Sequence, residues 1–144
     1  MKIADWMKRE VWSVKPLDSI RHAREIMEEH RINQLPVVVE GAVVGIVTDR
    51  DLRDAFPSVF ESPGLGRARQ ARSVADPSAI VVESVMSSNV VKLGPNDDIV
   101  AAARLMRRER IGALPIVERD RLIGILTRSD ILNAFVALAE GTPR

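Results

Sequence analysis

The 144-residue chain contains no cysteine, which excludes disulfides and thiolate metal sites. It has no tyrosine and few other aromatic residues, so it is poorly supplied for stacking on unpaired bases. The chain has no large excess of positive or negative charge, because 21 basic residues are offset by 20 acidic ones. Proteins that bind nucleic acid usually need a concentrated basic face. The longest apolar runs fall far short of the ~20 residues that cross a bilayer, and no leader-like segment opens the chain. We therefore expect a cytoplasmic protein without membrane insertion or nucleic-acid binding.

What the sequence does contain is an internal repeat. Residues 3–56 align with residues 82–135 at a constant offset of 79, and 18 of the 54 aligned positions are identical. Unrelated stretches would match at roughly one position in fifteen, so the similarity indicates a duplication. The duplication predicts two equivalent clefts. The predicted organisation is a first repeat at 1–60, a linker at 61–80, a second repeat at 81–138 and a tail at 139–144.

Each copy carries the same order of secondary-structure signals. In the first copy a β-branched run at 11–14 precedes a helix capped by Asp18, a hairpin with its turn at 40–42, and a helix that starts after Thr48. The counterparts in the second copy are 89–93, Asp97, 118–121 and Thr127. One such unit leaves a sheet face uncovered. We therefore expect an α+β fold in which two β-α-β-β-α repeats pack sheet to sheet with pseudo-twofold symmetry.

The stretch between the copies is rich in Ser, Pro, Gly and Arg, which predicts a loop with a short helix around residues 67–73. We interpret its three arginines, Arg67, Arg69 and Arg72, as a solvated surface from which one side chain can reach a bound phosphate. His22 and His30 are too isolated for a metal site. No Ser-His-Asp order, metal cluster or Gly-rich phosphate loop is present, so we do not predict an enzyme.

Each copy ends in a Gly-x-x-Thr-x-x-Asp signature, at residues 45–51 and 124–130. This spacing fits a capping box, in which the Thr and Asp side chains satisfy each other's backbone amides at a helix start. It also fits a nucleotide site. A helix N-terminus suits phosphate, and a carboxylate can accept hydrogen bonds from two adjacent sugar hydroxyls. The signature alone leaves both interpretations open.

The repeat resembles the cystathionine-β-synthase (CBS) domain, and the tandem pair resembles a Bateman module. The resemblance is carried by Met7 and Met86, the Pro-Asp helix entries, the segments RINQLPVVV and RIGALPIV, and the two Gly-x-x-Thr-x-x-Asp endings. The segment VTDRDLRDAF at residues 47–56 also resembles acetoin-utilisation-type proteins, which are small CBS pairs. The resemblance implies a regulatory binding module.

CBS pairs bind AMP, ADP, ATP or S-adenosylmethionine between their repeats, and the resemblance implies such a regulatory ligand here, with no required cofactor. It implies that Asp51 and Asp130 hold ribose hydroxyls and that Thr48 and Thr127 lie near ribose or phosphate. The other implied contacts are Gln34 and Ala113 beside the adenine, Ser129 as an added hydroxyl, and Arg50 or Arg128 at a phosphate.

Two departures from the family pattern bear on these sites. Gln34 is larger and more polar than the small residue often found beside adenine, whereas Ala113 fits. Some members place an arginine where this chain has Asn33 and Gly112, so phosphate neutralisation falls to other arginines. We therefore expect one occupied site rather than two, and we expect it at the second copy, around Asp130.

Two hypotheses follow. The first is a module that senses an adenine nucleotide and reports it by a change in dimer geometry or in contact with an unidentified effector protein. The alternative is a structural dimerisation or docking module with vestigial nucleotide sites.

We also expect a homodimer, in which the acidic first helix of one subunit lies beside the basic helix of the other. The charges concerned are Glu25, Glu28 and Glu29 against Arg104, Arg107, Arg108 and Arg110.

Overall fold

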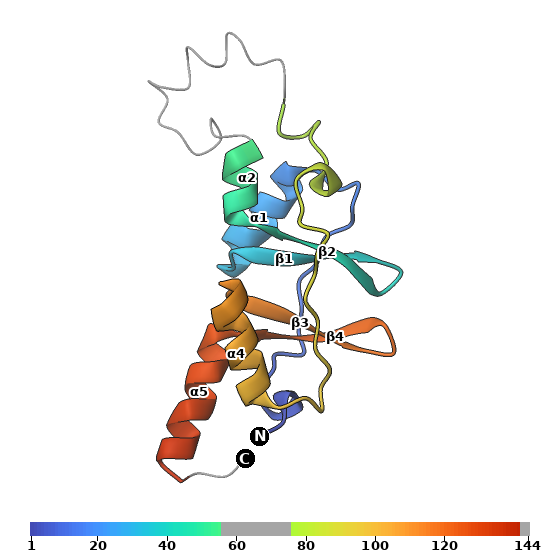
Figure 1. Cartoon of the computed structure of the whole chain (residues 1–144). Coiled ribbons are helices and arrows are strands. Elements are labelled where there is room, and N and C mark those ends of the chain that lie inside the picture. Colours follow the sequence, from blue (N-terminus) through green and yellow to red (C-terminus); the bar gives the residue numbers. More distant parts are fainter. Residues whose placement is uncertain (56–75, 142–144) are drawn as a thin grey trace, which may run out of the picture. The chain divides into compact units, whose positions relative to one another are not determined.

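The computed structural model describes residues 1–55 and 76–141 (Figure 1). Its helices and strands are η1 Ile3–Asp5, α1 Ile20–His30, β1 Gln34–Val39, β2 Ala42–Thr48, α2 Asp49–Ala55, η3 Val82–Ser84, α4 Ile99–Glu109, β3 Ala113–Glu118, β4 Arg121–Thr127 and α5 Arg128–Ala139. The fold is α+β, and both copies show the predicted order of helix, hairpin and helix. Nothing among the described helices has the length and hydropathy required to span a bilayer. The predicted linker helix and the linker arginines lie outside the described residues.

The chain forms two compact units that do not coincide with the two repeats. One unit consists of Met1–Val11 and Val91–Arg144, and the other of Trp12–Val90. Each unit therefore combines the body of one repeat with the opening segment of the other. We call residues 1–11 and 80–90 the crossing segments.

Each crossing segment pairs with the edge of the hairpin in its own unit. Lys8 and Ile125 of β4 exchange both backbone hydrogen bonds, each at 2.9 Å. Ser87 and Ile46 of β2 do the same, again at 2.9 Å in both directions. The pairing is antiparallel in both units, so the two crossing segments are hydrogen-bonded to the edges of their hairpins in the same way.

The opposite edge of each hairpin is paired by a single residue. Val14 forms an isolated parallel bridge to Val37 of β1, and Leu93 forms one to Ile116 of β3. The predicted strands at 11–14 and 89–93 are therefore wrong as strands. Only one residue of each run reaches bridge geometry, and a proline two residues later prevents the run from continuing as a donor ladder.

The hairpins turn through two residues in the left-handed region. Their φ angles are 50° and 87° at Glu40 and Gly41, and 52° and 64° at Arg119 and Asp120. Two positive φ values in sequence are typical of a type I′ turn, whose twist matches that of the flanking strands. The structure thus confirms the predicted hairpins and shortens their turns, which were predicted at 40–42 and 118–121, to two residues each.

Both first helices begin one residue later than predicted. The N-caps are Ser19 and Asp98, whose side chains accept hydrogen bonds from first-turn amides. Asp18 and Asp97, the predicted caps, accept hydrogen bonds from the amide three residues earlier in the chain. Their carboxylates close the turn that precedes the helix, so the residue after each of them is left to cap it.

Each unit has its own apolar core, formed by residues of its hairpin, its helices and its crossing segment. In one unit Leu114, Ile116 and Leu126 of the hairpin pack with α4 residues and with Ile3 of the crossing segment. In the other unit the hairpin packs with α1 and with Val82 in the same way. Ile3 and Val82 are both fully buried, so burial of apolar surface stabilises the crossing segments in place.

The glycine of each Gly-x-x-Thr-x-x-Asp signature makes room for a crossing segment. A Cβ atom added at Gly124 would lie 2.6 Å from Met7 Sδ and 2.9 Å from the Lys8 carbonyl oxygen. At Gly45 the matching distances are 2.5 Å to Met86 Sδ and 3.0 Å to the Ser87 carbonyl oxygen. A side chain at either position would collide with the methionine and crowd the backbone carbonyl of the next residue, so the glycine is needed for this close packing.

We predict that Gly124→Ala lowers the free energy of unfolding by about 1–3 kcal/mol, because the added methyl group overpacks the contact with Met7 and Lys8. Urea denaturation measures this change. Gly94→Ala is the matched control, since its Cβ would meet nothing closer than 3.6 Å. Equal losses in the two variants would contradict this role for the glycine.

Candidate functional site

In the first copy, Thr48 and Asp51 form a reciprocal capping box at the start of α2. The Thr48 amide donates to Asp51 Oδ2 at 2.8 Å, and the Asp51 amide donates to Thr48 Oγ1 at 3.1 Å. Both side chains are half-buried. The capping interpretation is confirmed here, but it uses only one oxygen of the carboxylate. Among the described residues, nothing hydrogen-bonds to Asp51 Oδ1.

In the second copy, Asp130 is held more completely. Its Oδ2 accepts hydrogen bonds from the Thr127 amide at 2.8 Å and from the Thr127 hydroxyl at 3.0 Å. Its Oδ1 accepts a hydrogen bond from Lys8 Nζ at 2.7 Å, and the same ammonium lies 3.2 Å from Thr127 Oγ1. The Asp130 side chain is 5% exposed. Both of its oxygens are therefore occupied by groups of the same unit.

Lys8 is the site residue that the sequence interpretation missed. It lies outside the Gly-x-x-Thr-x-x-Asp signature and reaches Asp130 only because its crossing segment pairs with β4. The alignment does contain a signal, since Lys8 follows Met7 where the second copy has Ser87 after Met86. A charged residue replaces a small hydroxyl at a position next to two identical methionines.

The residues predicted beside the adenine lie across the hairpin from the capping threonines. Gln34 is paired with Thr48 in the β1–β2 register, and Ala113 is paired with Thr127 in the β3–β4 register. The structure thus brings the predicted strand and helix residues of each copy together. Gln34 is half-buried, whereas Ala113 is 1% exposed and offers almost no surface to a ligand.

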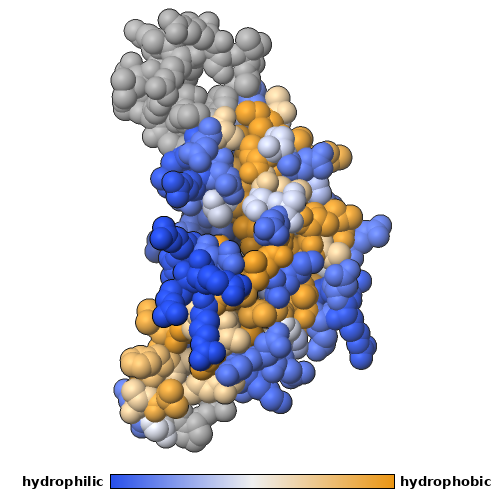
Figure 2. All heavy atoms as spheres, viewed as in Figure 1, coloured by the Kyte–Doolittle hydropathy of each residue, from blue (hydrophilic) through white to orange (hydrophobic). Residues whose placement is uncertain are grey.

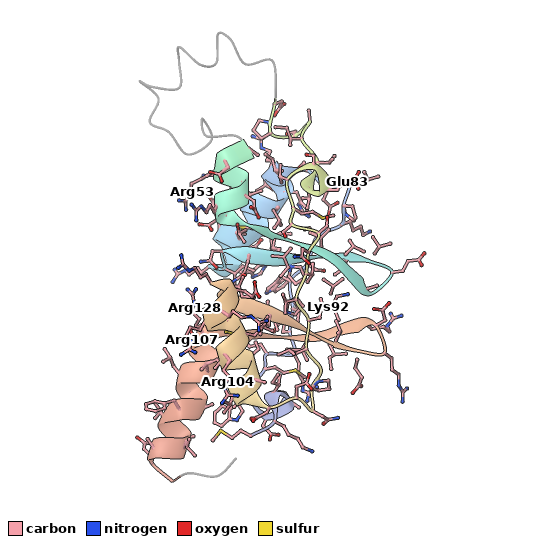
Figure 3. The ribbon with its side chains drawn as sticks, in the orientation of Figure 1. Arg53, Glu83, Lys92, Arg104, Arg107 and Arg128 are labelled. Carbon is pink, nitrogen blue, oxygen red and sulfur yellow. The ribbon has the colours of Figure 1, made fainter. Side chains whose placement is uncertain are left out.

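The predicted hydroxyl and arginine contacts lie on the solvent side of the helix starts. Arg50 and Ser129 are exposed first-turn residues of α2 and α5, and Arg128 is exposed as the first residue of α5. Figure 3 shows Arg128 there and Arg107 on the adjoining α4. These arginines can approach an anion near the helix starts without displacing buried groups. Within residues 1–55 and 76–141, no group of three His, Cys, Asp or Glu side chains is placed to hold a metal ion.

A family model for the CBS domain matches residues 3–58 and 82–137. The chain belongs to the CBS domain family. One relative, the CBS domain-containing protein YhcV of Bacillus subtilis, is 32% identical over 129 residues, which cover 90% of this chain and 81% of YhcV. The tandem arrangement seen in the sequence is thus that of a CBS pair.

Solved structures with this fold include other CBS pairs. A putative acetoin utilization protein (AcuB) from Vibrio cholerae has a TM-score of 0.75 at 27% identity, over 97% of this chain and 93% of that one. CBSX2 in complex with AMP gives 0.76 at 25% identity, over 96% and 98%. The CBS domain pair of protein MJ0100, in complex with 5-methylthioadenosine and S-adenosyl-L-methionine, gives 0.72 at 26% identity, over 94% and 99%.

Some relatives of this CBS pair are enzymes, but the similarity covers only part of them. The inosine-5'-monophosphate dehydrogenase of Korarchaeum cryptofilum is 33% identical over 124 residues, which are 85% of this chain and 22% of that enzyme. The shared region is therefore the CBS pair and not a whole enzyme. The chain is a regulatory module of the CBS type and not an enzyme.

We predict that Thr48→Ala lowers the free energy of unfolding of this CBS pair by about 0.5–2 kcal/mol, because the Asp51 amide loses its capping acceptor. Chemical denaturation of the variant beside Arg50→Ala measures the effect. Arg50 is an exposed neighbour, so its truncation should change stability by no more than about 0.5 kcal/mol. A Thr48→Ala protein as stable as the control would show that the capping box contributes nothing.

Proposed function

We propose that this CBS pair binds an adenosine-containing regulatory ligand, with the free oxygen of Asp51 as acceptor for the ribose hydroxyls. One observation carries the proposal: the capping box fixes the Asp51 carboxylate through Oδ2, while Oδ1 has no hydrogen-bond partner among the described residues. The complexes of CBSX2 with AMP and of MJ0100 with 5-methylthioadenosine and S-adenosyl-L-methionine support this ligand class. A fixed carboxylate binds hydroxyls without a further ordering cost.

The other predicted contacts have defined places in this proposal. In site one, Thr48 lies beside the ribose, Gln34 beside the base, and Arg50 beside a phosphate. In site two the corresponding residues are Thr127, Ser129 and Asp130 at the ribose, Ala113 at the base and Arg128 at the phosphate. AMP, ADP, ATP and S-adenosylmethionine share the adenosine group that these contacts recognise. We place the protein in the cytoplasm, where these nucleotides occur.

The fold gives such a ligand a way to influence the rest of the chain. Each site lies at a helix start, next to the β-strand that pairs with a crossing segment of the other repeat. A ligand there contacts residues from both repeats within one unit, so its affinity depends on the position of the crossing segment relative to the hairpin. We propose that this coupling shifts the population of conformations, which an effector protein detects.

We predict that Asp51→Ala weakens binding of AMP or S-adenosylmethionine about tenfold or more, because hydrogen bonds to a charged group contribute about 1.5–3 kcal/mol. Titration calorimetry with each of AMP, ADP, ATP and S-adenosylmethionine measures the affinity. Asp49→Ala is the matched control, since Asp49 lies in the same helical turn and pairs with Arg53 at 2.6 Å. No heat with any of the four ligands would reject the proposed function.

The alternative function, a structural module with vestigial sites, is favoured by one specific observation. The same Thr and Asp side chains cap their own helices in both copies, and Asp130 is fully engaged. A module of this kind needs no ligand to explain the recurrence of Thr and Asp. The titrations above separate the two functions, because a vestigial site loses stability but no ligand response when its aspartate is replaced.

We also propose a homodimer whose contact is made by α5. Leu132, Phe135 and Val136 lie at helical spacing on α5 and are 63%, 65% and 49% exposed. Figure 2 shows apolar side chains gathered over this helix. The predicted contact between acidic and basic helices has less support, because Glu28 pairs with Arg24 of its own helix at 2.8 Å. Exposed apolar patches of this kind mark association surfaces.

We predict that Phe135→Glu converts a dimer into a monomer, because it places a charge in the apolar contact of α5. Light scattering at several protein concentrations measures the mass. Asn133→Glu adds the same charge at an exposed position of the same helix outside the apolar stripe, and should leave the dimer intact. A monomeric wild-type protein, or a dimeric Phe135→Glu variant, would contradict the α5 contact.

A further inference from the structure

The two copies place the same Thr-Asp pair at a helix start but complete it differently. Asp130 accepts hydrogen bonds on both carboxylate oxygens, and one of the donors is Lys8 Nζ at 2.7 Å. Asp51 uses Oδ2 alone, and Oδ1 has no partner within the described parts of the chain. The oxygen that a ligand hydroxyl would use is therefore available in site one and occupied by an ammonium group in site two.

The difference comes from a side chain and not from the backbone. Lys8 and Ser87 occupy aligned positions, and each exchanges two 2.9 Å backbone hydrogen bonds with the central isoleucine of the neighbouring strand. Both directly follow a methionine that packs on the signature glycine. The serine side chain is short and uncharged, whereas the lysine stem is long enough to reach the carboxylate. The backbone frame is the same, but Lys8 contacts Asp130, whereas no hydrogen bond joins Ser87 to Asp51 among the described residues.

A ligand that enters site two has to replace a charge-assisted contact with a weaker one. An ammonium-carboxylate hydrogen bond is roughly twice as strong as one between neutral groups. The Asp130 side chain is 5% exposed and that of Lys8 is 53% exposed, so water screens this pair mainly from the lysine side. Loss of that contact would also leave the nearly buried carboxylate without its cation. In site one no such exchange is needed, because no cation of the described residues lies on Asp51.

We infer that the residue pair Lys8 and Ser87 determines which of the duplicated sites takes the adenosyl ligand: Ser87 leaves site one open, and Lys8 keeps site two closed. This inference rests on the proposed function and deepens it. It also reverses the expectation from the sequence, in which the small Ala113 favoured the second copy. The residue beside the aspartate has a larger effect on ligand binding than the residue beside the base. Ala113 is only 1% exposed, so its small size gives a ligand almost no additional surface.

The test exchanges the two residues. Titration calorimetry with AMP, and separately with S-adenosylmethionine, should give one equivalent per chain for the wild type, two for Lys8→Ser and none for Ser87→Lys. The double exchange should again bind one equivalent, now sensitive to Asp130→Ala instead of Asp51→Ala. In Lys8→Ser, affinity at site two should rise about tenfold or more over the wild type.

Two control variants test whether these outcomes depend on the position and on the charge of the substituted side chain. Ser88→Lys adds the same charge at the next exposed residue and should leave the stoichiometry at one. Lys8→Met keeps the length of the stem without its charge, so it should open site two even if Lys8→Ser folds poorly. Thermal melts report whether each variant is folded.

The failures of the two ideas are distinguishable. If no variant binds either ligand, the proposed function fails and this inference fails with it. If the wild type binds two equivalents, or if both Lys8 variants still bind one, adenosyl binding stands and the inference is overturned. A fall in AMP affinity in Lys8→Ser would make Lys8 a phosphate contact, which also overturns it.

Discussion

The structure depends on the backbone pairing between each crossing segment and the hairpin edge in its unit. Lys8 with Ile125, and Ser87 with Ile46, are single antiparallel bridges, yet they fix where the opening residues of one repeat meet the body of the other. This contact requires the signature glycine, packs a methionine against it, and in one unit places Lys8 beside the helix-capping Asp130. The difference in side-chain contacts between Asp130 and Asp51 therefore arises on a backbone contact that both copies share.

The capping box links the stability of the fold to the candidate site. A carboxylate that accepts from the Thr48 or Thr127 amide is held in one orientation before any ligand arrives. Such preorganisation lowers the ordering cost of binding, because the side chain has already lost its rotamer freedom. Capping and ligand binding are then not exclusive roles, since a carboxylate has two oxygens. The proposed binding at Asp51 rests on the second oxygen of its carboxylate, which the capping box does not use.

Local features of this fold were predictable from the sequence, and contacts between the repeats were not. The helices, the hairpins and the capping threonines follow from hydrophobic periodicity and turn chemistry within about ten residues. The caps of α1 and α4 lie one residue later than predicted because Asp18 and Asp97 accept from amides of the preceding turn, which leaves the next polar residue to cap each helix. Lys8 was missed for a different reason: its contact with Asp130 spans 122 positions, and no local pattern specifies which hairpin a crossing segment joins.

The two copies share 18 of 54 aligned positions, and the shared residues include those on which the backbone contacts depend. The residues that the crossing geometry and the capping box demand, namely the Gly, Met, Thr and Asp of each copy, are the same in both. Several positions near the candidate site differ between the copies, such as Lys8 against Ser87 and Gln34 against Ala113. A pair of sites built on one frame can thus acquire unequal roles through single side chains. Two stable copies are needed for the crossing arrangement, because each unit is completed by the opening segment of the other repeat. A copy whose site no longer binds a ligand is therefore still required for the fold.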